Sequence, residues 1–260
     1  MFELQFFLIG IIQGITEFLP ISSSGHLVLF AELTSWEDQG LFTDVAVHFG
    51  TLFAVIFYMR KEIYYLILNI FKFQIFDNKI ILKIVIATIP AIIIGFFIYD
   101  FVTLYFRNIK VMAISSIVFA IILYVADQKI TKSKSWKNIT FKEALIIGLW
   151  QVMAFIPGAS RAGVTITGAR FLKFNRFNAT KFSMLLSIPI ILASLSLSLI
   201  NFYNSSDSVT NLYPSIFASF VAFITALLSI TFMMRLILIT NFNIFILYRI
   251  LLGIFIFLFV

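Results

Sequence analysis

The sequence predicts an all-α integral membrane protein, an inverted-topology repeat with about six transmembrane helices and two re-entrant helical hairpins. Composition is the first observation: 61% of the 260 residues are hydrophobic and 12% are charged, whereas soluble domains are about 45–50% apolar and about 25% charged. The mean hydropathy is +1.05. The second observation is the presence of apolar runs of about twenty residues, which fit helices better than the short alternating strands of a barrel. The third is a polar motif that occurs twice.

The N-terminal region predicts the first re-entrant hairpin. Residues 3–19 are apolar but end at Pro20 and a Ser/Gly run, and residues 27–33 are apolar again for barely two turns. Neither piece is long enough to cross a bilayer, which takes about 20 residues. Non-helical backbone at membrane depth is tolerated where protein or a water-filled cavity satisfies it. Residues 143–171 repeat this pattern, with the tip at Pro157-Gly158, and predict the second hairpin.

Six full spans are expected from the remaining apolar runs. They cover approximately residues 43–59, 82–100, 111–126, 181–201, 213–235 and 242–260. Between the first two of these spans, residues 60–81 are partly apolar with scattered lysines. This composition predicts an interfacial helix, with a further short span as the alternative.

One membrane domain is expected over residues 1–260, with repeat 1 at about 1–126 and repeat 2 at about 143–260. Each hairpin is followed by three spans, and an odd number of spans inverts the second repeat relative to the first. The hairpins also share residues. Gly10-x-x-Gln13 matches Gly148-x-x-Gln151, and Phe18-Leu19-Pro20-x-x-Ser23 matches Phe155-Ile156-Pro157-x-x-Ser160 after a one-residue deletion. Inverted repeats with broken helices place a site near the midplane, at the repeat interface.

The basic residues are distributed unevenly along the chain, which has a formal net charge of +7. Fourteen Lys and Arg residues lie in the segments 60–83, 127–142 and 170–181, with Arg235 beside them, whereas the opposite loops carry Arg107 and Lys110. By the positive-inside rule, loops 34–42, 100–110 and 202–212 face outside. The same rule explains the basic balance, so membrane lipids and not nucleic acid are the expected partner. The absence of cysteine excludes disulfides and thiolate chemistry.

The first hairpin tip concentrates polar side chains in an apolar region. A carboxylate such as Glu17 costs about 2.5–3.5 kcal/mol to insert, so its expected role is metal ligand, base or proton carrier, with an interfacial ion pair as the alternative. Gln13 lies one helical turn earlier on the same face. The run Ser22-Ser23-Ser24-Gly25 predicts an anion site at a helix N-terminus, or a simple helix cap. His26 is a candidate nucleophile or general acid, with a packing role as the alternative.

The second hairpin tip carries Arg161, far in sequence from the basic loops. A buried guanidinium needs an anion, and its planar fork suits phosphate. Small and hydroxylated residues surround it in the sequence, namely Gly158, Ser160, Gly163 and Thr165. The alternative is an ion pair with Glu17. Two other polar residues inside spans are interpreted structurally: His48 as a hydrogen-bond partner of a neighbouring helix, and Arg249 as a snorkelling or locally paired side chain.

The paired motifs resemble one known family. Gln13-x-x-x-Glu17, Pro20-x-Ser22-Ser23-Ser24-Gly25-His26 and Pro157-Gly158-Ala159-Ser160-Arg161-Ala162-Gly163-Val164-Thr165 resemble the undecaprenyl-diphosphate phosphatase family, also called the bacitracin-resistance protein family. The resemblance implies hydrolysis of undecaprenyl diphosphate to undecaprenyl phosphate and inorganic phosphate, which recycles the lipid carrier for cell-wall synthesis. It also implies a multi-pass protein of the bacterial plasma membrane, with an extracytoplasmic active site and a divalent cation, Mg²⁺ or Ca²⁺.

The resemblance also suggests roles for individual residues. Glu17, Ser23, His26 and Arg161 are the expected catalytic residues. Gln13, Ser22, Ser24, Gly158, Ser160 and Thr165 are expected to bind the substrate, and Glu17 with Gln13 the metal. Two positions depart from the family, which often has Glu at Gln13 and Ser at Ala162; Glu17 therefore carries any acid–base role alone.

Several alternatives stay open at this level. Either Ser23 or His26 attacks the terminal phosphorus. A transporter or flippase for a lipid phosphate or an ion fits the inverted repeat equally well. The partners expected are a polyprenyl diphosphate and membrane lipids; the sequence does not define the oligomeric state, and a homodimer stays open.

Overall fold

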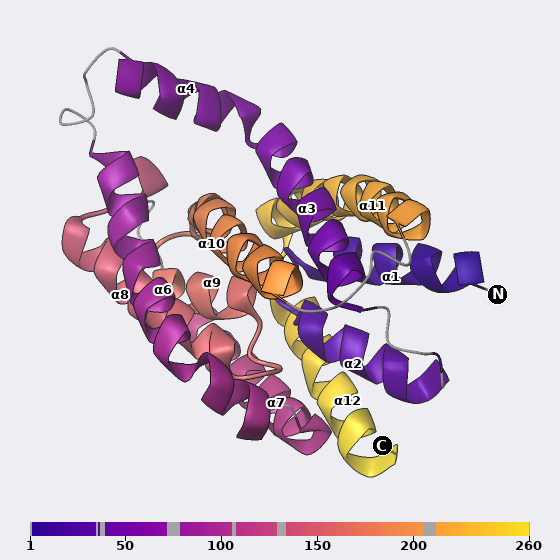
Figure 1. The fold of residues 1–260 in the computed structure, drawn as a ribbon. Coiled ribbons are helices and arrows are strands. Elements are labelled where there is room, and N and C mark those ends of the chain that lie inside the picture. The colour runs from indigo at the N-terminus through magenta and orange to yellow at the C-terminus, as the bar shows by residue number, and fades with distance from the viewer. Residues whose placement is uncertain are drawn as a thin grey trace.

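Long apolar helices dominate the computed structural model, which describes residues 2–34, 36, 40–71, 79–105, 108–128, 134–204 and 212–259 (Figure 1). Four helices in these ranges are long and apolar enough to cross a membrane: α6 (Ile80–Tyr105), α7 (Ile109–Asp127), α10 (Arg176–Asn204) and α11 (Leu212–Ile239). A fifth span results if the helix α3 (Gly40–Tyr58) is counted together with the next helix, α4 (Arg60–Phe71). The predicted all-α integral membrane class is confirmed. The run expected as the sixth span forms α12 (Asn243–Phe259), which is apolar but has 17 residues.

The segment expected to lie at the interface forms α4 (Arg60–Phe71). It is bent by 74° from α3 at a short break, so it runs across the direction of α3 and does not continue it. Its first turn carries Arg60, Lys61 and Glu62. This orientation suits an interfacial helix. Of the remainder of the predicted segment, residues 72–78 lie outside the described residues, and Ile80 and Ile81 belong to α6.

Each predicted hairpin consists of two short helices around a broken tip. The first comprises α1 (Phe2–Thr16) and α2 (Ser23–Thr34), and the second α8 (Phe141–Val152), the 3-10 turn η2 (Met153–Phe155) and α9 (Arg161–Phe171). The four α-helices have 15, 12, 12 and 11 residues, short of the about 20 that a span requires. The re-entrant prediction therefore agrees with the lengths of these helices.

The two tips share an unusual backbone conformation. Ser22 has φ +73° and Ser160 has φ +70°, and each precedes the second helix of its hairpin. Left-handed φ values are costly for residues other than glycine. The shared conformation aligns Ser22 with Ser160 and Ser23 with Arg161, whereas the sequence match aligns Ser23 with Ser160. The two alignments of the tips differ by one residue. The sequence match follows residue types, and residue types do not reveal which residue adopts a left-handed φ value.

Helices from the two halves of the chain pack against each other. The hairpin helix α1 packs against α11 of the C-terminal half, and α8 packs against α6 of the N-terminal half. The helices α3 and α10 also contact each other, as do α7 and α12 (Figure 1). A Cβ atom at Gly10 would lie 2.6 Å from the Ala218 carbonyl, and one at Gly148 would lie 2.5 Å from the Ala87 carbonyl. The repeated glycine is thus required for close helix approach. The repeat boundaries near residues 126 and 143 stay a prediction.

Alanine at Gly148 is expected to lower the free energy of unfolding by about 1–3 kcal/mol, because overpacking moves a helix backbone and the clash is with a carbonyl oxygen. Unfolding of the purified protein in mixed micelles measures the effect. The matched control is Gly25→Ala, where the nearest atom would lie at an ordinary 3.5 Å. Equal stability of the two variants would contradict the assigned close contact.

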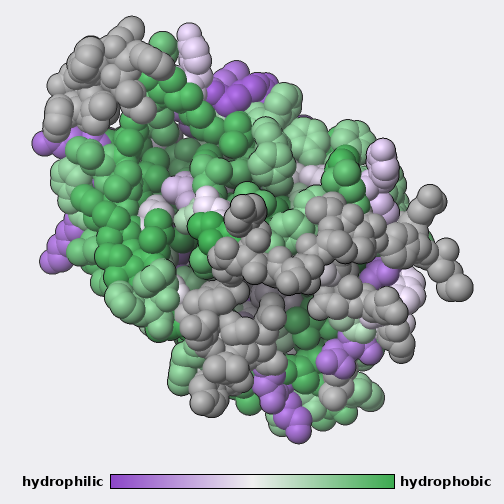
Figure 2. Space-filling view, viewed as in Figure 1, coloured by the Kyte–Doolittle hydropathy of each residue, from purple (hydrophilic) through white to green (hydrophobic). Residues whose placement is uncertain are grey.

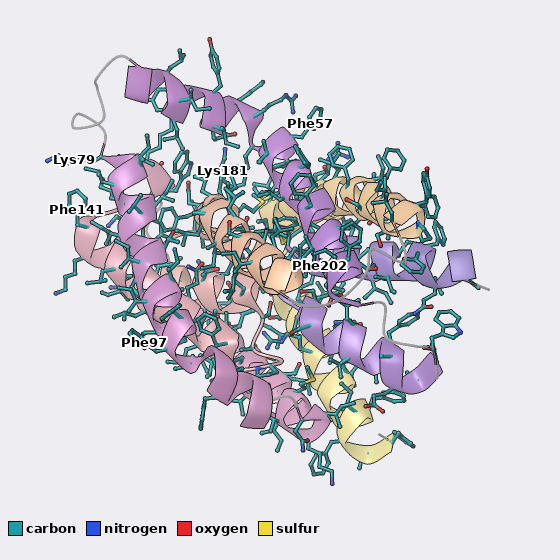
Figure 3. The ribbon with its side chains drawn as sticks, in the orientation of Figure 1. Phe57, Lys79, Phe97, Phe141, Lys181 and Phe202 are labelled. Atoms are coloured by element: carbon teal, nitrogen blue, oxygen red, sulfur yellow. The ribbon has the colours of Figure 1, made fainter. Side chains whose placement is uncertain are left out.

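The outer surface is apolar, as expected of a lipid-facing protein. On the face shown in Figure 2, most of the residues coloured by hydropathy are hydrophobic, and the most hydrophilic of them lie mainly towards its edges. Phe57 on α3 and Phe97 on α6 are 53% and 77% exposed, and Figure 3 shows both at the periphery. Side chains of this size are stable in such positions when hydrocarbon surrounds them.

A buried ion cluster ties four segments together at Asp127, the last residue of α7. Arg170 Nε lies 2.9 Å from Asp127 Oδ1, as an ion pair and not a well-directed hydrogen bond. Arg176 Nε donates to the same oxygen at 3.0 Å, and the Phe242 amide donates to Oδ2 at 3.3 Å. The Asp127 side chain is 0% exposed. The cluster therefore holds α7, α9, α10 and the turn before α12 in one arrangement.

This cluster changes the interpretation of the charge count. Arg170 and Arg176 are counted in the sequence as loop cations on the inner side, but the structure pairs both with Asp127. Other residues of that count lie outside the described ranges, among them Lys72, Arg107, Lys129 and Lys132. The positive-inside orientation stays a prediction.

Candidate active site

The two hairpin tips meet at an ion pair between Glu17 and Arg161. Glu17 follows the last residue of α1, and Arg161 is the first residue of α9. Arg161 Nη2 donates to Glu17 Oε1 at 2.7 Å, and the guanidinium lies 5.6 Å from the centre of the Phe18 ring. The Glu17 and Arg161 side chains are 8% and 14% exposed. The two tips thus face each other, and the ion pair that the sequence left as an alternative is the contact present.

The second carboxylate oxygen of Glu17 accepts two further hydrogen bonds. Gln13 Nε2 donates at 2.9 Å from within α1, and Ser23 Oγ donates at 3.1 Å from the first residue of α2. The helices α2 and α9 therefore both begin at a residue that donates to Glu17. Helix N-termini favour nearby negative charge. One carboxylate is thus the shared acceptor of both hairpins.

His48 of α3 also lies beside this carboxylate. Its Nε2 is 4.0 Å from Glu17 Oε2, and its Nδ1 is 2.7 Å from the Asp44 carbonyl oxygen of the same helix. A carbonyl only accepts, so Nδ1 carries the proton and Nε2 faces the carboxylate. The expectation that His48 bonds a neighbouring helix is wrong. A titratable group inside an apolar span is a signal of function, but the sequence does not show which helix α3 faces.

His26 lies close in the chain but bonds elsewhere. Its Nδ1 is 2.7 Å from the Ser22 carbonyl oxygen and its Nε2 is 2.6 Å from the hydroxyl of Tyr248 on α12. The His26 and Tyr248 rings are nearly parallel, at 3°, with centroids 5.6 Å apart. Sequence reasoning does not single out Tyr248, because a tyrosine in an apolar C-terminal span carries no distinguishing pattern.

The other serines of the tips have different surroundings. Ser22 is 5% exposed and its hydroxyl lies 3.4 Å from that of Ser24, which is exposed. Ser160 caps α9, since its hydroxyl accepts a hydrogen bond from the Gly163 amide at 3.2 Å. The first tip therefore reaches the surface at Ser24, while Ser160 supports the start of α9.

Thr165 and Gly158, both predicted to bind substrate, contact α10 and α7, respectively. Thr165 is fully buried, and its hydroxyl bonds the Arg161 carbonyl at 2.9 Å and the Ser183 hydroxyl at 2.6 Å. Gly158 has φ +91°, and a Cβ there would lie 2.4 Å from the Met112 carbonyl of α7. In this arrangement Thr165 steadies the first turn of α9, and Gly158 allows the tip to approach α7 closely.

Arg249 of α12 is buried at the second tip. Its side chain is 0% exposed, and Nη2 donates to the carbonyls of Gly158 at 2.8 Å and Ala159 at 3.0 Å. Its Nε and Nη1 have no hydrogen-bond partner among the described residues. The expectation of snorkelling or a local pair is wrong. The carbonyls of a non-helical tip need donors, and Arg249 supplies them from another helix.

Comparison with known proteins identifies the family. The model of the family described as Bacitracin resistance protein BacA matches residues 6–255. The chain belongs to the BacA family. A protein of Aliivibrio salmonicida named undecaprenyl-diphosphatase is 42% identical over 258 residues, covering 95% of this chain and 94% of that protein. A protein of Idiomarina loihiensis with the same name is 40% identical over 237 residues, covering 89% of each chain.

The BacA match extends over both hairpin tips, so Glu17 and Arg161 lie inside it. A protein of a Ruegeria strain, also named undecaprenyl-diphosphatase, is 40% identical over 257 residues and covers 96% of each chain. The family resemblance predicted from the paired motifs is confirmed.

The BacA site offers one pair of oxygen ligands for a hard cation. The Gln13 amide donates through Nε2 to the Glu17 carboxylate, and its buried Oε1 has no hydrogen-bond partner among the described residues. No group of three His, Cys, Asp or Glu side chains suited to a metal occurs in the part of the chain that the structure describes. Mg²⁺ often takes one carboxylate plus substrate phosphates. An orphaned carbonyl oxygen beside a carboxylate fits that pattern.

Proposed function

We propose that this BacA-family chain hydrolyses undecaprenyl diphosphate to undecaprenyl phosphate and inorganic phosphate in the bacterial plasma membrane, and so recycles the lipid carrier for cell-wall synthesis. The Glu17–Arg161 contact carries the proposal, because it joins a carboxylate and a phosphate-binding cation at the junction of two hairpins. The relatives named undecaprenyl-diphosphatase support the same reaction.

Arg161 is the residue proposed to bind the diphosphate. Its Nη2 is engaged by Glu17, while its buried Nη1 has no hydrogen-bond partner among the described residues. Phosphoryl transfer depends on positioning and on neutralising the charge of the phosphate oxygens. A guanidinium with one nitrogen held and another available to a phosphate oxygen meets both needs.

Ser23 is the better placed of the two candidate nucleophiles. Its hydroxyl donates to Glu17 Oε2 at 3.1 Å, so the carboxylate is in position to accept the proton. In the proposed first step, Ser23 Oγ bonds to the terminal phosphorus, and the bond from that phosphorus to the bridging oxygen breaks. The leaving group is undecaprenyl phosphate, which receives the Ser23 proton through Glu17. In the second, water attacks the phosphoserine, and Glu17 moves a water proton to the departing Ser23 oxygen, releasing inorganic phosphate.

Gln13 Oε1 and the Glu17 carboxylate are the residues that would hold Mg²⁺ or Ca²⁺. Such an ion supplies positive charge to the phosphate oxygens when bound. The resemblance to the family implies a site that faces the extracytoplasmic side. Around the site, Ser24 and Tyr248 are exposed and His48 is partly exposed, as are Glu17, Ser23, His26 and Arg161.

Phosphate release by the purified protein tests the proposal. The protein in detergent, supplied with a polyprenyl diphosphate, is expected to release inorganic phosphate with Mg²⁺ or Ca²⁺ and to stop when EDTA is added. Acid and alkali lability of a trapped phosphoprotein distinguishes phosphoserine from phosphohistidine. Transport of a lipid phosphate by reconstituted vesicles, without phosphate release, would favour the flippase alternative and overturn the proposal.

Leucine at His48 is expected to lower kcat/KM about tenfold. The substitution replaces a polar neighbour 4.0 Å from the Glu17 carboxylate with an apolar side chain, and a tenfold loss corresponds to about 1.4 kcal/mol of transition-state stabilisation. Initial rates of phosphate release measure the effect. Phe49→Leu, at the next and exposed residue of α3, is the control and is expected to match the unaltered protein. A His48→Leu protein with unchanged kcat/KM would rule out this contribution.

A further inference from the structure

Tyr248 makes a contact that the proposed chemistry does not use. It lies 222 residues from His26 in the chain, on α12, and the structure places its hydroxyl 2.6 Å from His26 Nε2. We propose that Tyr248 is a positioning residue. Its hydroxyl orients the His26 ring and makes Nε2 the nitrogen through which His26 exchanges a proton. This inference rests on the proposed function and adds to it: the steps described above move protons through Glu17, and the inference gives His26 Nε2 the separate task of exchanging a proton with the bound phosphate.

The hydrogen bonds of His26 determine its tautomer. The Ser22 carbonyl oxygen, 2.7 Å from Nδ1, is an acceptor only, so Nδ1 carries the proton. The neutral imidazole then presents a lone pair at Nε2, and the Tyr248 hydroxyl donates to it. Both ring nitrogens are therefore held, one from its own hairpin tip and one from α12. Nε2 is the nitrogen that can exchange a proton with a bound phosphate.

The position of Tyr248 is itself anchored. The next residue, Arg249, is buried and donates to the Gly158 and Ala159 carbonyls at the second tip. The Arg249 carbonyl in turn accepts a hydrogen bond from Ser116 of α7 at 3.3 Å. Two consecutive residues of α12 thus contact the two hairpin tips. A displacement of α12 would move both the His26 partner and the tip that carries Arg161.

The surroundings leave Tyr248 as the side chain that controls Nε2. Among the described residues, no carboxylate or basic group forms an ion pair with His26, and its ring nitrogens make hydrogen bonds with Ser22 and Tyr248. Tyr248 is 43% exposed, so it stands at the edge of the site and not in the core. A tyrosine hydroxyl at the edge of the site can move away from Nε2 when a phosphate binds there. The hydrogen bond from Nδ1 to the Ser22 carbonyl then still holds the ring.

Nitrogen NMR of the ligand-free protein tests the contact directly. The chain has two histidines, so ¹⁵N-histidine labelling gives two rings, and His26→Asn assigns them. We expect His26 to carry its proton on Nδ1. Tyr248→Phe keeps the ring but deletes the hydroxyl, and is expected to shift the His26 Nε2 resonance while His48 stays unchanged. An Nε2-protonated His26, or an Nε2 resonance unaffected by Tyr248→Phe, would overturn the proposal.

Kinetics test the consequence for turnover. Tyr248→Phe is expected to lower kcat about tenfold with little change in KM, a loss in the range of one hydrogen bond, and to change the pH profile of kcat. Tyr124→Phe, at an exposed tyrosine of α7, is the control. A Tyr248→Phe protein with the kcat and pH profile of the unaltered protein overturns the positioning role. If the unaltered protein releases no phosphate, the proposed function fails, and the nitrogen resonances alone decide whether Tyr248 holds His26.

Discussion

Glutamine at Glu17 is expected to lower the rate of phosphate release by about 10²- to 10⁴-fold, the range attributed to a positioned acid or base. Glutamine has nearly the same shape but accepts no proton from Ser23, whose hydroxyl lies 3.1 Å from the carboxylate. It also removes the anion that pairs with Arg161, a largely buried guanidinium. Initial rates at saturating substrate, on protein checked for folding by gel filtration, measure the effect.

The first hairpin offers a matched control for this substitution. Glu32 on α2 is exposed, and Glu32→Gln is expected to leave the rate unchanged. Arg161→Lys tests the other partner: it retains the charge but loses the planar fork that holds a carboxylate and a phosphate together, so a large loss is again expected. If Glu17→Gln keeps most of its turnover, Glu17 is not the base, and the assignment of the site is wrong.

Asparagine at Asp127 is expected to lower the free energy of unfolding by about 3–5 kcal/mol, the cost of breaking a buried ion pair. The Arg170 side chain is 3% exposed, and the substitution leaves it without a charged partner. The helices α7, α9 and α10 lose the group that joins them. Unfolding of the purified protein in mixed micelles measures the change.

Glu62→Gln is the control for the cluster. Glu62 pairs with Lys181, but the two side chains are 21% and 18% exposed, and partly exposed pairs contribute about 0–1 kcal/mol. A much smaller loss of stability is therefore expected than for Asp127→Asn. Equal losses in the two variants would show that burial of the Asp127 cluster does not determine its contribution.

The hairpins show how far local sequence signals reach. Pro20 and Pro157-Gly158 interrupt apolar runs, and the structure ends helices before each of them. The polar residues of both tips are recognisable because their insertion into a membrane is costly. The backbone register is not: the left-handed φ values fall on Ser22 and Ser160, which align the tips one residue away from the sequence match.

Three other residues show where local signals end. His48, Tyr248 and Arg249 lie in apolar spans and contact Glu17, His26 and the second tip, respectively. Successive residues of a helix point about 100° apart, so identifying these partners requires the rotation of each helix about its axis. That rotation results from packing between segments more than a hundred residues apart, as for α12 against α7.

The sequence by itself determined the membrane class, the two broken hairpins and the residues at their tips, because apolar length, chain breaks and costly polar groups are local properties. The tertiary structure alone decided that Glu17 accepts from both hairpins and that α12 contacts the two tips through Tyr248 and Arg249. These contacts depend on how helices from both halves of the chain pack, and packing is a property of pairs of surfaces rather than of any one segment.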